Sequence, residues 1–83
     1  MRIATALRLI ESEAIGASQK FKAFNSAHEG YAVLKEEVDE LWDEVKKNES
    51  KHPDRDACLR KEAIQVGAMA LRFLTDICEG DDC

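Results

Sequence analysis

Apolar residues recur along most of this chain at the three- and four-residue spacing of an amphipathic helix. This spacing predicts three helices, over residues 2–20, 27–47 and 57–79. The stretch between the second and third helices, NESKHPDRD, is polar and holds the only proline, so it predicts a loop. No comparable stretch shows the strict alternation of a strand. The pattern therefore predicts an all-α fold.

A chain of 83 residues is long enough for one domain. We divide it into an N-terminal helix with a hook (1–24), an acidic helix (25–48), a loop (49–56), a second long helix (57–79) and a frayed tail (80–83). A domain this small buries only about 60–65% of its unfolded surface, and oligomerisation is a usual remedy for the resulting low stability.

The connection between the first two helices contains two phenylalanines and a capping signature. Phe21 and Phe24 lie just past the first helix, and we expect both to fold back onto the core. Ser26 and Glu29 have the spacing of a capping box, which predicts the start of the acidic helix at residue 27.

The acidic helix carries an apolar stripe and a group of carboxylates on one flank of it. At 100° per residue, one line of the helix holds the predicted core face: Tyr31, Leu34, Val38, Leu41 and Val45. Glu37, Glu40 and Glu44 lie together beside that face, where they are partly desolvated. Like charges held close repel each other unless a cation neutralises them. The pattern is compatible with a divalent-metal site, or with a solvated helix edge paired to nearby lysines.

The helix over 57–79 is apolar on two sides. Around Val66 lies an inward face: Leu59, Ala63, Ala70, Phe73, Leu74 and Ile77. A second stripe at steps of seven lies roughly opposite: Ile64, Leu71 and Cys78. A helix apolar nearly all round is normally buried all round. We therefore expect two long antiparallel helices plus the N-terminal helix, assembled through the second stripe into a helical-bundle homodimer, tetramer or other oligomer.

Antiparallel packing of the two long helices predicts that their polar flanks meet. Glu37 and Glu40 would then face Glu62 and Gln65 of the other helix. Three carboxylates and one amide around one point are oxygen ligands of the kind that Mg²⁺ or Mn²⁺ prefers. The residue pattern alone is also compatible with a solvated face.

Three basic or aromatic polar residues are candidates for binding an anionic ligand beside that point. Lys61 and Arg72 lie on the same flank of the third helix and are candidates for phosphate oxygens. His28 lies in the first turn of the acidic helix, within reach of a ligand there. The alternative for the lysine and the arginine is a solvated helix face with local ion pairs.

Composition excludes several classes of protein. The net charge is −5 and no basic stripe is present, which argues against nucleic-acid binding. No apolar run reaches the roughly 20 residues needed to span a membrane, and the first ten residues do not form a signal peptide. We therefore expect a cytoplasmic protein with no membrane association. Three cysteines without a CxxC pair do not indicate zinc.

The segment LKEEVDELWDEV followed by LRKEAIQVGAMALRFLTDI resembles the MazG-like all-α nucleotide pyrophosphohydrolases, over roughly residues 25 to 79. That family is marked by E-x-x-E on one helix and E-x-x-D on the next. Glu37-x-x-Glu40 matches the first half. Glu62-x-x-Gln65 matches the second, except that an amide stands where the last acid belongs. HEGYAVLKEEVDELWDE also resembles the small phage and mobile-element members.

The resemblance implies a reaction and a set of roles. The reaction is Mg²⁺-dependent hydrolysis of a nucleoside triphosphate, NTP or dNTP, to the monophosphate and pyrophosphate. Glu37, Glu40 and Glu62 would be the catalytic residues and the metal ligands, and Gln65 would be a weakened fourth ligand. The alternative is a non-catalytic helical module that binds a nucleotide or a partner and keeps the fold with a degraded metal site. A carboxylate-bridged di-iron bundle is disfavoured because no histidine follows these glutamates at E-x-x-H spacing.

Overall fold

A computed structural model of the chain describes residues 1–48 and 50–80, and these form three helices and no strand. The helices are α1 (Ile3–Lys20), α2 (Ala27–Val45) and α3 (Arg55–Ile77). The predicted all-α fold is confirmed. Helix α2 ends two residues earlier than predicted. Helix α3 both begins and ends two residues earlier than predicted. The expected loop position 49 and tail residues 81–83 lie outside the described residues.

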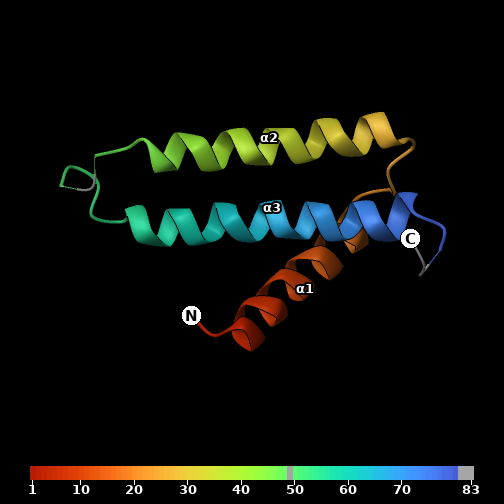
Figure 1. Cartoon of the computed structure of the whole chain (residues 1–83), viewed down its shortest axis with the longest axis horizontal. Helices are drawn as coiled ribbons and strands as arrows, with labels where there is room; N and C mark the ends of the chain where they lie inside the picture. The colour runs from red at the N-terminus through yellow and green to blue at the C-terminus, as the bar shows by residue number, and fades with distance from the viewer. Residues whose placement is uncertain (49, 81–83) are drawn as a thin grey trace.

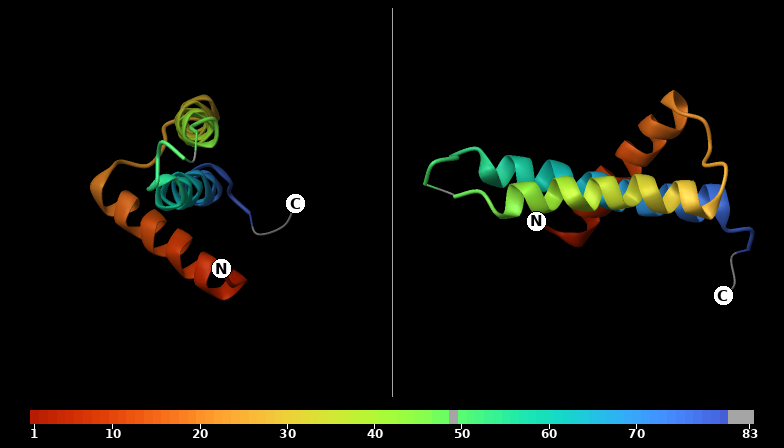
Figure 2. Two further views of the ribbon diagram at one scale, coloured as in Figure 1. Left: turned by 90° about the vertical axis from the view of Figure 1, so that its left-hand side faces the viewer. Right: turned by 90° about the horizontal axis from the view of Figure 1, so that it is seen from above.

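The three helices form a row with α3 in the middle. α2 runs alongside α3 in the opposite direction, and α1 crosses α3 obliquely (Figure 1). Viewed along the long axis, α1 and α2 lie on opposite sides of α3 (Figure 2). The antiparallel arrangement of α2 and α3, on which the predicted site depends, is thus present.

The start of α2 is fixed by its own sequence. The backbone N–H of Glu29 donates to Ser26 Oγ at 3.1 Å, as the capping signature predicts. The Glu29 carboxylate does not complete the reciprocal bond to Ser26. Instead it accepts from the backbone N–H and the side-chain amide of Asn25, at 3.0 and 3.1 Å. These bonds hold the turn between the linker and α2.

The face that α2 turns toward α3 differs from the predicted one. Tyr31, Val38 and Val45 were expected in the core, but they are 62%, 44% and 40% exposed. The less exposed positions are Gly30, Val33, Leu34, Glu37, Leu41 and Glu44. The helix is therefore rotated about its axis relative to the prediction, so that two glutamates share the α3-facing side with apolar residues. One cause is close packing at Gly30, where an added Cβ would lie 2.7 Å from the Phe73 ring.

The side of α3 that carries the second apolar stripe is partly covered by α1. Leu71 packs against a buried cluster that includes Ala14 and Ala17 of α1. Gly67 allows a close approach, since a Cβ there would lie 2.9 Å from Ile10. Cys78, the last residue of the stripe, is exposed. The chain itself therefore covers part of the stripe that the sequence assigned to a partner.

The core of the isolated chain is small. Its buried apolar residues are Ala14, Ala17, Phe24, Ala68 and Met69. Phe24 folds back as expected, whereas Phe21 is exposed, which corrects that prediction. The radius of gyration is 14.1 Å, against about 12 Å for a compact domain of this length. Three helices in a row thus leave much apolar surface exposed. No helix among residues 1–48 and 50–80 has the length and apolarity that crossing a membrane requires.

Candidate functional site

Three glutamates from two helices converge as the sequence predicts. Glu37 and Glu40 lie one turn apart on α2, and Glu62 lies opposite them on α3. Each offers one carboxylate oxygen, and the three oxygens lie within 4.8 Å of one another. We call these residues the glutamate cluster. Glu37 and Glu62 are half-buried, whereas Glu40 is exposed.

The charges of the glutamate cluster disfavour one another. Partial burial, followed by the charge of Glu40 and a hydrogen bond with it, raises the pKa of Glu37 from 4.5 to about 7. Burial and Glu40 also raise the pKa of Glu62. One oxygen of Glu62, Oε2, is buried and has no hydrogen-bond partner among the described residues. A buried carboxylate oxygen is normally paired, so this atom is an acceptor suited to a cation.

The rotation of α2 places these carboxylates where a stable core would hold apolar groups. Val38 is exposed, while its neighbour Glu37 faces α3. Glu44, one turn beyond Glu40, also faces α3, and Lys47 pairs with one of its oxygens at 2.9 Å. Burying acids while exposing a valine costs stability, and such local conflicts are expected at functional sites.

A cavity of about 500 Å³ adjoins the glutamate cluster. We call it the linker cavity, because α1, the α1–α2 linker, α2 and α3 all contribute to its wall. Glu37 belongs both to the cavity wall and to the glutamate cluster. Phe24, Val33 and Met69 supply apolar wall, and Lys20 and Lys22 supply positive charge. A volume of this size is within the range of small-molecule sites.

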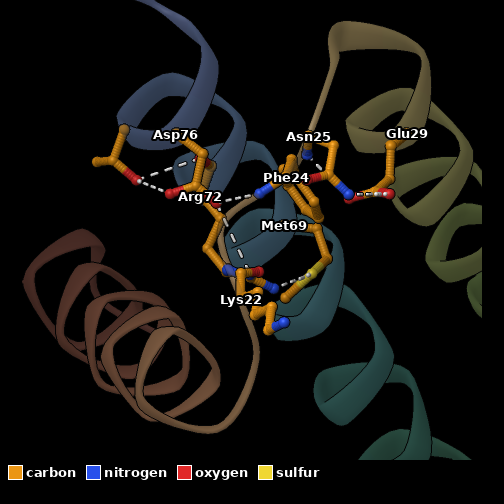
Figure 3. A network of polar contacts seen from close by, with 8 residues as sticks. Lys22, Phe24, Asn25, Glu29, Met69, Arg72 and Asp76 are labelled. Carbon is orange, nitrogen blue, oxygen red and sulfur yellow. Dashed lines mark hydrogen bonds and ion pairs between the residues drawn. The ribbon is translucent and has the colours of Figure 1, made fainter.

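Arg72 is the most deeply placed charge of the linker cavity. Its side chain is 4% exposed, and its guanidinium lies over the Phe24 ring, 4.6 Å from the centroid. It donates to the backbone carbonyl of Lys22 at 3.0 Å and lies 3.6 Å from Asp76 (Figure 3). Asp76 in turn accepts from the backbone N–H of Phe24 at 3.1 Å.

This network gives Arg72 two properties. It ties the linker to α3, and it leaves the buried guanidinium Nε without a partner among the described residues. Among the described residues, the only hydrogen bond of the Nη1 nitrogen goes to the weak acceptor Met69 Sδ at 3.8 Å. Arginine donors left free in a cavity wall suit an anionic oxygen. The alternative interpretation of Arg72, as a residue on a solvated helix face, is therefore wrong.

Gln65 lies one turn beyond Glu62 and lines the linker cavity. Its side-chain amide donates to Glu13 Oε1 of α1 at 2.6 Å. The structure thus gives the residue that stands in place of the expected acid a partner on another helix. Its service as a fourth metal ligand stays a prediction.

The other two predicted ligand-binding residues lie outside the linker cavity wall. Lys61 is exposed beside Glu62, where its charge lowers the pKa of that carboxyl in opposition to the acids. His28 is exposed in the first turn of α2 and does not line the cavity. The structure therefore brings Arg72 to the cavity and leaves His28 away from it.

Sequence reasoning missed the contribution of α1 and the linker. Glu13, Lys20 and Lys22 all line the linker cavity, and none was predicted to do so. One available signal was the segment KFKAF at the end of α1, in which two lysines and two phenylalanines lie within five residues. Glu13 gave no signal, because its position depends on the crossing angle of α1 over α3.

Comparison of the chain with protein-family models, with curated proteins and with solved structures finds no match. The resemblance to the MazG-like family therefore rests on the motif residues and their helix order.

Proposed function

We propose that the chain is a nucleoside triphosphate pyrophosphohydrolase that requires Mg²⁺ or Mn²⁺. The reaction converts an NTP or dNTP to the monophosphate and pyrophosphate. The observation that carries the proposal is the convergence of Glu37, Glu40 and Glu62 from two helices beside a cavity lined with cationic side chains. The family resemblance supplies the reaction, and the geometry supplies a place for it.

The donor set of the glutamate cluster fits a hard cation. Three carboxylate oxygens within 4.8 Å, one of them from a residue with an unpaired buried oxygen, suit Mg²⁺ or Mn²⁺ better than zinc. When bound, the ion would polarise the phosphates and lower the pKa of a bound water. Binding would also offset the burial and the repulsion by Glu40 that raise the Glu37 pKa.

The linker cavity complements a nucleotide. Arg72, Lys20 and Lys22 supply positive charge for an anionic ligand, in a wall that also holds the acids Glu13, Glu29 and Glu37. Phe24 and Val33 offer apolar surface to a nucleoside. Lys61, exposed beside Glu62, is the candidate for the distal phosphates.

The competing function is a helical module that binds a nucleotide or a partner without turnover. The observation that favours it is the bond from Gln65 to Glu13, since the position of the expected fourth acid is occupied by an amide engaged elsewhere. Such a module would keep the cavity and the fold but would hold a metal weakly. Turnover is the measurement that separates the two.

The chain is also proposed to function as a homo-oligomer. Its accessible surface is 6444 Å², against about 5,000 Å² for a compact monomer of this mass. The excess is of the size that a stable homodimer buries per subunit. Because α1 covers part of the α3 stripe, the apolar face proposed for assembly is the exposed one on α2: Tyr31, Val38, Trp42 and Val45. A second copy of the chain would cover this face. Leu74 and Cys78 of α3 are also exposed.

The decisive test of turnover is a panel of NTPs and dNTPs with Mg²⁺, read as pyrophosphate and as the nucleotide product. We expect monophosphate and pyrophosphate, and no diphosphate. Glu40→Gln and Glu62→Gln are expected to lower kcat/KM at least about a hundredfold. Glu36→Gln, an exposed neighbour outside the glutamate cluster, is the charge-matched control. Background release across the panel would remove the enzymatic function and leave the binding module.

Assembly is tested by light scattering. We expect a mass of at least twice 9.3 kDa for the wild type. Val38→Glu should yield helical monomers, because Val38 is already exposed in the single chain. Ser12→Glu on the exposed side of α1 should leave the mass unchanged. A monomeric wild type at micromolar concentration would refute the assembly.

A further inference from the structure

The linker cavity contains a polar pair that the proposed reaction does not require. Glu13 of α1 and Gln65 of α3 face each other across the helix crossing and are joined by the 2.6 Å bond from the Gln65 amide to Glu13 Oε1. Both are half-buried, and both line the cavity. No cationic group lies within ion-pair distance of Glu13 among the described residues, so its charge faces the cavity uncompensated.

The atoms left over from this bond are a hydrogen-bond acceptor and a donor beside it. Within the described part of the chain, the second Glu13 oxygen receives no hydrogen bond, and the Gln65 amide, which carries two N–H groups, uses only one of them. The pair thus presents an acceptor next to a donor, beside apolar wall from Val33 and Met69. The complementary ligand is a flat ring that carries an amino group next to an unprotonated ring nitrogen.

We infer that the Glu13–Gln65 pair reads the exocyclic amino group of a nucleobase, so that the site accepts adenine or cytosine nucleotides in preference to those of guanine, uracil or thymine. This inference rests on the proposed function, because it assumes that the linker cavity holds the nucleoside while the glutamate cluster faces the phosphates. Glu37, which belongs to both, fixes that order.

The discrimination has a physical basis. An amino group donates to the carboxylate, and hydrogen bonds to charged groups are the stronger class. Uracil and thymine carry a carbonyl oxygen where cytosine carries its amino group, and guanine carries one where adenine carries its amino group. In the same pose that oxygen would lie against the Glu13 carboxylate, which repels it. A site built to bond a donor rejects an analogue that lacks it, because the acceptor of the site is then left unpaired.

A purely structural role for the pair predicts a different result. If Glu13 and Gln65 only brace α1 against α3, their substitution changes stability and affects every nucleotide alike. Selectivity within a pair of nucleotides that differ at the amino group is therefore the informative measurement, because a loss of fold cancels in the ratio.

The experiment compares kcat/KM for ATP against ITP, which carry an amino group and a carbonyl oxygen at the same ring position, and for CTP against UTP. We expect at least about a tenfold preference for the amino-bearing member of either pair. In Glu13→Ala the preference should fall to within about twofold, and Glu13→Gln should retain part of it. Equal kcat/KM within both pairs would overturn the inference while leaving the proposed reaction intact.

A binding measurement separates failure of the reaction from failure of the inference. Calorimetry with AMP and IMP, on the wild type and on Glu13→Ala without metal, requires no turnover. Tenfold tighter binding of AMP that is lost in Glu13→Ala would support the inference even if no triphosphate is hydrolysed. Equal binding of both monophosphates, or binding of neither, would overturn it.

Discussion

Substitution of Glu40 by Gln should stabilise the metal-free protein and destabilise the magnesium-bound one relative to wild type. Raising the Glu37 pKa from 4.5 to about 7 corresponds to an upper limit of about 3.4 kcal/mol above pH 7. Solvent screening of the partly exposed carboxyl reduces this cost, and burial accounts for the larger share of what remains. Removing the Glu40 charge should therefore recover about 1 kcal/mol.

The size of this effect depends on pH. A carboxyl with a raised folded-state pKa contributes stability that is fully present below pH 4.5 and is lost as the pH rises to about 7. The metal-free wild type should lose stability across that window. Glu40→Gln should lose less, so the two proteins should differ at pH 8 and converge at pH 5. For a domain of this size, 1 kcal/mol corresponds to a Tm difference of about 4–8 °C.

Magnesium should reverse the order. An ion that binds only the folded protein adds about 2.7 kcal/mol at 100 times its Kd. The wild type should gain this stabilisation, and Glu40→Gln, with one ligand oxygen pair replaced by an amide, should gain little. The assay is thermal unfolding at one protein concentration, at pH 5 and pH 8, with and without Mg²⁺.

The control is Glu36→Gln, which makes the same change in net charge on the same helix. Glu36 adds the smallest of the contributions that raise the Glu37 pKa. Its variant should follow the wild type in both conditions. The reasoning fails if Glu40→Gln is no more stable than wild type at pH 8 without metal, or if Mg²⁺ raises the Tm of both proteins equally.

Three further predictions follow from other contacts. Mg²⁺ must displace the Glu37 proton, so calorimetry should show about tenfold tighter binding at pH 8 than at pH 6; equal affinity would place the ion elsewhere. Urea unfolding should show Gly30→Ala destabilised by about 1–3 kcal/mol, because a Cβ would lie 2.7 Å from Phe73. Gly16→Ala, with nothing within 4 Å, should gain about 0.5–1 kcal/mol; the same sign at both positions would contradict the packing. Asp76→Ala removes the partner of buried Arg72 and should cost about 2–4 kcal/mol by the same method. Asp56→Ala, which breaks an exposed pair with Arg60, should cost under about 0.5 kcal/mol, and equal losses would mean that burial does not matter here.

The sequence was sufficient for the helices and for the meeting of Glu37, Glu40 and Glu62, because periodicity and antiparallel packing are local consequences of residue order. It misplaced the buried face of α2. The apolar stripe through Tyr31 and Val38 is a regular helical pattern, but Gly30 permits closer packing against Phe73 and turns the glutamates inward. Periodicity identifies apolar faces without stating whether their own chain or another molecule covers them.

The linker cavity was beyond sequence reasoning for a related cause. Glu13 and Gln65 are 52 residues apart and meet only because α1 crosses α3 at one particular place. That crossing depends on the small side chains of Ala14, Ala17 and Ala68. Alanines in a sequence do not indicate where, or at what angle, another helix crosses them. The close grouping of two lysines and two phenylalanines at the end of α1 was the one local sign that this segment lines a site.

The central position of α3 makes the two outer helices unequal in how firmly they are held. α2 lies along nearly the full length of α3, whereas α1 crosses it and is otherwise attached only through the linker (Figure 1). Amide protons of α1 should therefore exchange with solvent faster than those of α3. Since one wall of the linker cavity belongs to α1, any molecule held there would slow that exchange. Slower amide exchange in α1 would therefore show that the cavity is occupied.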